Sequence, residues 1–171
     1  MITVGISETN STIKQLSRQL FRICGLRCSS SLKKTDSDFI FCSPKSGTGY
    51  DILIENNTPA TGSHGDYIHL VNSDEVLPLP GTEHTVFITY GLNPFATVTA
   101  SSIIEEGRHL HFQYCLQRNI VSLKGKIIEC QEFPVSIYHT GIDLHSALAF
   151  VTLSLVAGIS AKKLEQIITV T

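Results

Sequence analysis

Charged residues are scarce in this sequence, and a long apolar run is absent. Only 16% of the 171 residues are charged, 42% are hydrophobic, and the formal net charge is -2. This composition excludes an intrinsically disordered chain and fits one globular domain with a sizeable core. The lysines and arginines are scattered and form no basic stripe, so we expect no nucleic-acid partner.

The longest apolar run is too short to cross a membrane. It extends from Ala147 to Ala157 and is interrupted by Thr152 and Ser154, whereas a spanning helix needs about 20 apolar residues. No basic segment followed by an apolar one opens the chain, as a secretory signal peptide would require. We therefore expect a cytoplasmic protein without a membrane partner.

The cysteines lack the spacing of a metal site. They are Cys24, Cys28, Cys42, Cys115 and Cys130. Three residues separate Cys24 from Cys28, but no second pair of cysteines or histidines follows at zinc spacing. We expect buried, reduced thiols and no bound metal.

Two sets of residues with histidine are further candidates for site chemistry. His64 and Asp66 fall in the turn-rich stretch 55–66, and long loops often carry binding residues. His109 and His111 alternate along an expected strand, which places both rings on one face, a geometry that can bind a metal. Neither set has a third ligand at a fixed spacing, so the sequence predicts no metal site and leaves the role of these histidines open.

Periodicity predicts an α/β fold that begins with a strand, a polar turn and a helix. The first helix is expected over Ile13–Cys24, with Ile13, Leu16, Leu20 and Ile23 or Cys24 on its apolar side and Gly25 at its end. Its N-cap is expected within 9–11, whose residues all carry short polar side chains. The expected strands of this part are 2–6, 26–29, 38–42, 50–54, 67–72 and 84–91.

The second half of the sequence has a different pattern of apolar and polar residues. Short alternating segments between 96 and 138 are typical of an antiparallel meander, with a turn at 105–108. Asp143 and Ser160 are expected to cap two closing helices, with Leu164, Ile167 and Ile168 facing inward in the second.

The polar turn after the first strand invites comparison with nucleotide-binding domains, in which such a turn presents N–H groups to phosphate. Segment 4–13 resembles the ATP loop of the Mur ligases, whose pattern reads roughly I-T-G-T-N-G-K-T-T. Ile6, Thr9 and Asn10 agree with that pattern, and Ser7 is a mild change. The other interpretation of the segment is a well-capped first helix.

The departures from the pattern fall on its chemical positions. Glu8 and Ser11 replace the two glycines, Thr12 replaces the lysine, and Ile13 replaces the hydroxyl residue that would ligate magnesium. Glu8 would also place a negative charge where the triphosphate should bind. The loop is therefore expected to be inactive in ATP chemistry.

The resemblance to the Mur ligase central domain continues along the chain in the family's order. The matching segments are Val71–Asp74, Ile88–Gly91, Ala96–Ile103, Ala147–Phe150 and Ala157–Ser160. Asn72 and Asp74 survive at the expected adenine edge.

Other family features are replaced or missing. Ile142, Asp143 and Ser146 stand where the family has His and Asn near the nucleotide. A brief loop replaces the family's long metal-binding insert between residues 54 and 67, and we expect both flanking substrate domains of the family to be missing.

This resemblance implies a fold and a function. The fold is a mainly parallel Rossmann-like or P-loop-like sheet with helices and a small antiparallel meander, in a single domain over 1–171. Its parts are the α/β sheet 1–91, the meander 96–138 and the closing helices 143–171. The vestigial nucleotide positions are Ser7, Glu8, Thr9, Asn10, Ser11, Thr12, Asn72 and Asp74.

The implied function is that of a pseudoenzyme without catalytic residues or cofactor, which binds a protein partner or self-associates. The alternative is a reduced nucleotide-binding protein or an ATP-dependent ligase-like enzyme of cell-wall precursor metabolism, with ATP and magnesium as cofactors.

Overall fold

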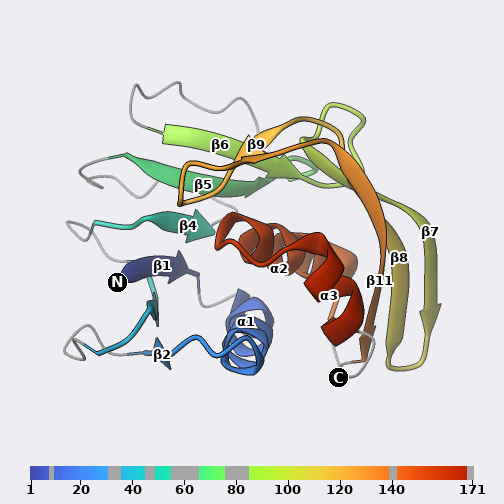
Figure 1. The fold of residues 1–171 in the computed structure, drawn as a ribbon. Coiled ribbons are helices and arrows are strands. Elements are labelled where there is room, and N and C mark those ends of the chain that lie inside the picture. Colours follow the sequence, from blue (N-terminus) through green and yellow to red (C-terminus); the bar gives the residue numbers. More distant parts are fainter. Residues whose placement is uncertain are drawn as a thin grey trace. The chain divides into compact units, whose positions relative to one another are not determined.

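The computed structural model describes residues 1–7, 10–30, 36–44, 49–54, 66–75, 85–138 and 142–168. The chain divides into two compact units, Met1–Ile88 and Thr89–Thr171 (Figure 1). Strand β6 (Thr85–Tyr90) crosses the boundary between them. The expectation of a single domain over the whole chain stays a prediction.

The first unit contains a parallel sheet and the helix α1. Its elements are β1 (Ile2–Ile6), α1 (Ser11–Ile23), β2 (Cys28–Ser29), β3 (Phe39–Cys42), β4 (Ile52–Ile54), β5 (Tyr67–Asn72) and the first residues of β6. The strand order is β6-β5-β4-β1-β3-β2. Parallel pairing joins β1 to β3 and β4, β3 to β2, and β4 to β5. The prediction of a mainly parallel sheet is confirmed.

Helix α1 packs on one face of this sheet. The Phe21 ring lies 4.7 Å from that of Phe39 and 5.7 Å from that of Phe41. Because side chains alternate along a strand and paired residues share a face, Val4 lies on the same face as Phe41. Ile23, predicted on the buried side of the helix, is 55% exposed, since the apolar stripe passes through Phe21 instead.

The second unit contains an antiparallel sheet, a short hairpin and two helices. Its elements are β7 (Val98–Glu106), β8 (His109–Leu116), β9 (Ile120–Val121), β10 (Ile127–Ile128), β11 (Gln131–Tyr138), α2 (Leu144–Val156) and α3 (Ala161–Ile168). Strand β8 lies between β7 and β11, and both pairings are antiparallel. Strands β9 and β10 form a separate antiparallel pair. The predicted antiparallel meander is confirmed. Its strands β7, β8 and β11 are longer than the short segments that the sequence predicts.

The predicted turn at 105–108 is too wide. Strand β7 continues to Glu106 and β8 begins at His109, so only Gly107 and Arg108 connect them. Gly107 has φ +63°, a conformation that glycine adopts without strain. This one residue supplies the reversal, and the glutamates remain in the strand.

The inner face of the antiparallel sheet packs against α2. Tyr114, fully buried on β8, forms a 2.9 Å hydrogen bond with Thr152 of α2. Eleven of the 13 residues of α2 are buried. Helix α2 is therefore the element that covers the inner face of the antiparallel sheet.

Both closing helices begin where the sequence predicts. The Asp143 carboxylate accepts a hydrogen bond from the Ser146 backbone N–H at 2.9 Å, and Ser160 accepts one from Lys163 at 3.4 Å. Leu164 is fully buried, as expected. The side chains of 167 and 168 lie outside the described residues. In the described part of the chain, the helices are too short or too polar to span a bilayer.

All five cysteines are free. Cys115 is buried, and Cys24, Cys28 and Cys42 are half-buried. The prediction of buried thiols is wrong for Cys130, which is exposed because it lies in the connection between β10 and β11.

Candidate functional site

The predicted nucleotide residues lie at the carboxyl edge of the parallel sheet. The register aligns Ile6 of β1 with Ile54 of β4, and Ile54 with Leu70 of β5. Ser7 and Asn72 therefore leave the sheet at the same edge, two strand spacings or about 10 Å apart. Open α/β sheets bind their ligands at this edge. Glu8 and Thr9 lie outside the described residues.

The turn between β1 and α1 is closed by contacts between Ser7 and Asn10. The Asn10 backbone N–H donates to the Ser7 carbonyl at 3.0 Å, and its side-chain amide donates to the Ser7 hydroxyl at 3.1 Å. Asn10 occupies the N-cap position of α1 but makes no side-chain cap hydrogen bond. Its φ of -102° and ψ of 32° differ from the extended conformation that aims a cap at the helix N–H groups. The predicted side-chain cap is therefore wrong for Asn10.

The first turn of α1 can be compared with the groups that the Mur pattern uses to bind ATP and magnesium. Ile13, which stands where the Mur pattern has its magnesium-ligating hydroxyl, is 0% exposed and belongs to the core. Thr12 is half-buried and Ser11 is exposed. Lys14 lines a shallow hollow of about 370 Å³ along the side of α1, together with Arg18. An apolar side chain in the core cannot ligate a metal, so Ile13 does not fit the magnesium that the resemblance implies.

Asn72 and Asp74 form a tight turn after β5. Asn72 is 1% exposed, and its side-chain oxygen accepts a hydrogen bond from the Asp74 backbone N–H at 3.0 Å. The Glu75 N–H lies 3.4 Å from the Asn72 carbonyl oxygen. Asp74 itself is exposed. The Asn72 amide thus shapes the end of the strand, as Asn side chains do in such turns.

Gly5, immediately before the candidate site, packs against an aromatic ring. A Cβ atom at this position would lie 2.9 Å from Leu53 Cδ1 and 3.0 Å from the Tyr50 ring. Tyr50, Leu53 and Tyr67 form a buried cluster. Sequence reasoning missed this contact, although a glycine inside a β-branched strand is a signal of close approach.

The structure places the histidines in different surroundings. His64 lies outside the described residues, and Asp66 is exposed. The rings of His109 and His111 are 5.7 Å apart and nearly parallel, so they share one face of β8 as predicted. His111 Nδ1 is hydrogen-bonded to the Ser136 hydroxyl. Among the described residues, no group of three or more His, Cys, Asp or Glu could hold a metal ion.

A buried histidine was not predicted. His69 on β5 is 2% exposed, and its ring centroid lies 6.1 Å from that of Tyr67 and 5.5 Å from that of Phe87. Its neighbours along the strand are apolar, so the period-two pattern alone could have placed it inside.

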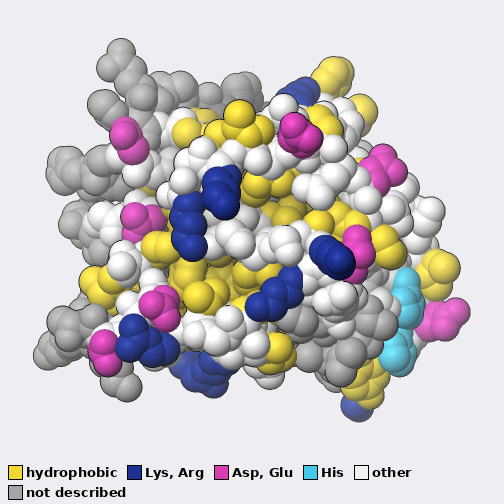
Figure 2. Space-filling view, viewed as in Figure 1, with side chains coloured by type: hydrophobic (Ala, Val, Ile, Leu, Met, Phe, Trp, Pro, Cys, Tyr) yellow, Lys and Arg dark blue, Asp and Glu magenta, His cyan; other side chains and the backbone are white. Residues whose placement is uncertain are grey.

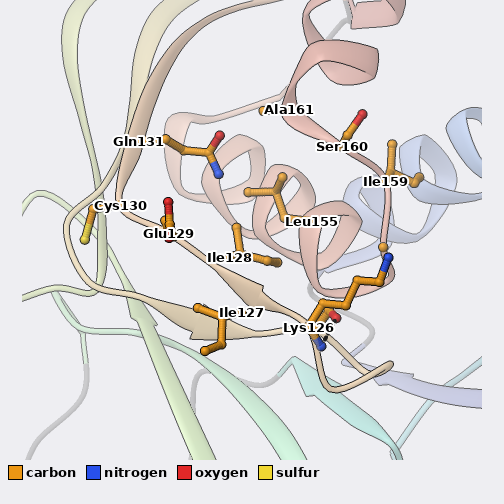
Figure 3. A pocket seen from close by; sticks show the side chains of 12 residues that line it. Lys126, Ile127, Ile128, Glu129, Cys130, Gln131, Leu155, Ile159, Ser160 and Ala161 are labelled. Atoms are coloured by element: carbon orange, nitrogen blue, oxygen red, sulfur yellow. Dashed lines mark hydrogen bonds between the residues drawn. The ribbon is translucent and has the colours of Figure 1, made fainter.

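The second unit contains a cavity of about 460 Å³ that the sequence did not indicate. It lies between the β9–β10 hairpin and the α2–α3 turn, and Leu155 and Ile128 point toward its middle (Figure 3). Lys126 extends toward the α2–α3 turn, and Glu129 and Ser160 supply further polar groups. The lining is mixed, and Figure 3 shows no convergence of catalytic groups among the residues drawn.

Comparisons with known proteins find solved structures of similar fold. No family model matches the sequence, and no curated protein matches it. MurF from Acinetobacter baumannii matches 99% of this chain with a TM-score of 0.66 and 9% identity. The MurF ligase from Thermotoga maritima in complex with ADP matches 97% with a TM-score of 0.63 and 10% identity.

This chain covers 45% and 48% of those two structures, and so spans about half their length. At such low sequence identity the likeness concerns the fold. The large, mostly parallel sheet with its helices and antiparallel part gives this chain the α/β fold seen in Mur ligases.

Proposed function

We propose that this chain is a non-catalytic protein with a Mur-ligase-like fold, which acts in the cytoplasm as a scaffold or interaction module. Its partner is another protein or a second copy of itself. The observation that carries this proposal is the burial of Ile13, which is 0% exposed at the position where the Mur pattern places a magnesium ligand.

The turn chemistry supports the same proposal. The Asn10 amide donates to the Ser7 hydroxyl, and the Asn72 amide oxygen accepts from the Asp74 backbone N–H, so both asparagine side chains are engaged in local turn contacts. What remains for phosphate is the N-terminus of α1, whose dipole contributes about 0.3–1 kcal/mol at an exposed position. Millimolar binding already needs about 4 kcal/mol. We therefore expect no useful affinity for ATP.

A second candidate is a reduced nucleotide-binding protein or an ATP-dependent ligase-like enzyme of cell-wall precursor metabolism. The placement of Ser7 and Asn72 at one edge of the parallel sheet favours it, because ligands bind at that edge in open α/β folds. Under this alternative, ATP and magnesium would bind around residues 7–12, Asn72 and Asp74.

Isothermal titration with ATP·Mg²⁺ and with ADP distinguishes the two candidates. The proposal expects no binding at micromolar nucleotide, and micromolar affinity would overturn it. A quadruple variant, Glu8→Gly/Ser11→Gly/Thr12→Lys/Ile13→Thr, restores the Mur pattern and tests whether the loop alone is responsible. We expect this variant to gain weak nucleotide binding without any ligase activity.

A further inference from the structure

Strand β7 has an outer edge that the described residues leave without a neighbouring strand. On one side it pairs with β8 along its length, whereas on the other side the pairing with β6 consists of Tyr90 opposite Val98. We call Thr99–Glu106 the β7 edge. All six residues from 101 to 106 are exposed, and β7 is the outermost strand of the second unit in Figure 1.

The β7 edge carries two large apolar side chains in its centre. Ile103 is 39% exposed and Ile104 is 52% exposed. A bulge between Ser101 and Ile104 sets two residues of β7 opposite one residue of β8, and it brings both isoleucines to the surface. At the margin of the space-filling view where Figure 1 places β7, hydrophobic and acidic side chains lie next to each other (Figure 2).

The other long edge of this sheet, strand β11, is protected against pairing with a further strand. The β7 edge lacks the same protection. Strand β11 has Pro134 near its middle and packs against α3. Proline and lysine are the residues by which sheet edges commonly resist pairing. Neither occurs between residues 99 and 106. An edge of eight residues is also longer than the average strand of about 5–6 residues.

We infer that the β7 edge pairs with the β7 edge of a second copy of this chain, in antiparallel orientation about a two-fold axis. The charge pattern makes the edge complementary to itself in antiparallel orientation. Antiparallel pairing sets Glu105 and Glu106 of one copy opposite the uncharged segment 99–101 of the other, and the isoleucines meet in the middle. Parallel pairing would set glutamate beside glutamate, which is unfavourable for directly opposed side chains.

The pairing adds a strand to each sheet and joins the two antiparallel sheets into one. Main-chain hydrogen bonds then hold the copies together, and the apolar centre excludes water. The bulge at Ser102, which has φ +51°, and the charged Glu105 and Glu106 at the end of the edge are features that proteins also use against pairing. Sedimentation is therefore needed to decide between association and protection.

The experiment measures the mass of the full chain by sedimentation velocity from about 1 to about 100 μM, a range that covers interfaces of micromolar affinity. We expect a change from 18.7 kDa to twice that mass as concentration rises. The variant Ile103→Lys/Ile104→Lys should stay monomeric, with its fold checked by circular dichroism. The matched control is Ile127→Lys, which charges a 69% exposed isoleucine on the β9–β10 hairpin and should dimerise like the wild type.

A wild-type chain that is monomeric throughout, or an edge variant that dimerises equally well, would overturn the inference. Assembly beyond dimers would contradict the two-fold arrangement. Hydrogen exchange gives a second readout, because the amides of residues 99–106 that point away from β8 should gain protection in the wild-type dimer and not in the edge variant.

This inference deepens the proposed function by naming a partner, and the two can fail separately. A dimer that binds ATP at micromolar concentration would overturn the proposed function and leave the pairing intact. A monomer that binds no ATP would overturn the pairing alone.

Discussion

The hydrogen bond between Tyr114 and Thr152 allows a quantitative test of the packing in the second unit. Both residues are 0% exposed. The Thr152 hydroxyl donates its only proton to the Leu148 carbonyl at 2.7 Å. In the 2.9 Å contact between the two side chains, Tyr114 must therefore be the donor and Thr152 the acceptor.

This direction predicts unequal costs for removing the two partners. Thr152→Val keeps the shape of the side chain but leaves the Tyr114 O–H buried without an acceptor, at a cost of about 1–3 kcal/mol. Tyr114→Phe removes the donor, while Thr152 still donates to Leu148, so its cost is that of one hydrogen bond, about 1 kcal/mol. The double variant should cost less than the sum, because no hydroxyl is then stranded.

Urea unfolding of the wild type, both single variants and the double variant measures these terms as a double-mutant cycle. Ser154→Ala is the matched control, since Ser154 also donates to a carbonyl one turn earlier, that of Phe150, at 2.8 Å. The control measures the cost of removing a hydroxyl that donates to a helix carbonyl and has no tyrosine partner. Additive single costs, or a Thr152→Val cost no larger than that of Tyr114→Phe, would refute the assigned direction.

Three further predictions follow from described contacts. Gly5→Ala should destabilise the first unit by about 1–3 kcal/mol in urea unfolding, because the new methyl group meets the Tyr50 ring; a smaller side chain at Tyr50 should relieve part of the loss, and the absence of relief would contradict the contact. Asp143→Ala should cost about 1 kcal/mol through the lost cap. Burial raises the pKa of Asp143, but the hydrogen bonds from Ser146 outweigh burial and hold the pKa below its ordinary 3.8. The wild type should therefore lose the stability contributed by the cap as pH falls through this lowered pKa, and the free energy of unfolding of the variant should depend less on pH in acid. Burial raises the pKa of Tyr114 above its ordinary 10.0, so the stability that the neutral side chain contributes is complete below pH 10 and declines as pH rises toward the folded pKa. The free energy of unfolding of Tyr114→Phe should therefore fall less steeply with alkaline pH than that of the wild type, and an equal slope would contradict the raised pKa.

Local patterns in the sequence were sufficient for much of the fold. The strand limits 67–72 are confirmed at both ends, because the buried run is bounded there by polar turn residues. The cap at Asp143 is confirmed because its hydrogen bond reaches a backbone N–H only three residues away. The common edge of Ser7 and Asn72 follows from parallel pairing, which places all carboxyl ends on one side.

The remaining features depend on contacts between distant segments. The Asn10 side chain turns toward Ser7 because of its backbone angles, which residue preferences do not determine. Gly5 is fixed by Tyr50, 45 residues later in the chain. The cavity beside Leu155 combines a hairpin with a helix turn about 30 residues away. Such contacts are set by tertiary packing, and a pattern within one segment does not contain them.

The burial of α2 has a consequence for how the protein is made on the ribosome. Strand β8 ends at Leu116, but the helix that covers the sheet is complete only at Val156, 40 residues later. At about 5–20 residues per second, translation of that stretch takes about two to eight seconds. During this interval the face that carries Leu110, Phe112 and Tyr114 has no α2 to cover it. The nascent chain therefore exposes this apolar face to solvent and to chaperones until α2 has been synthesised. A chain that ends before Leu144 should be insoluble.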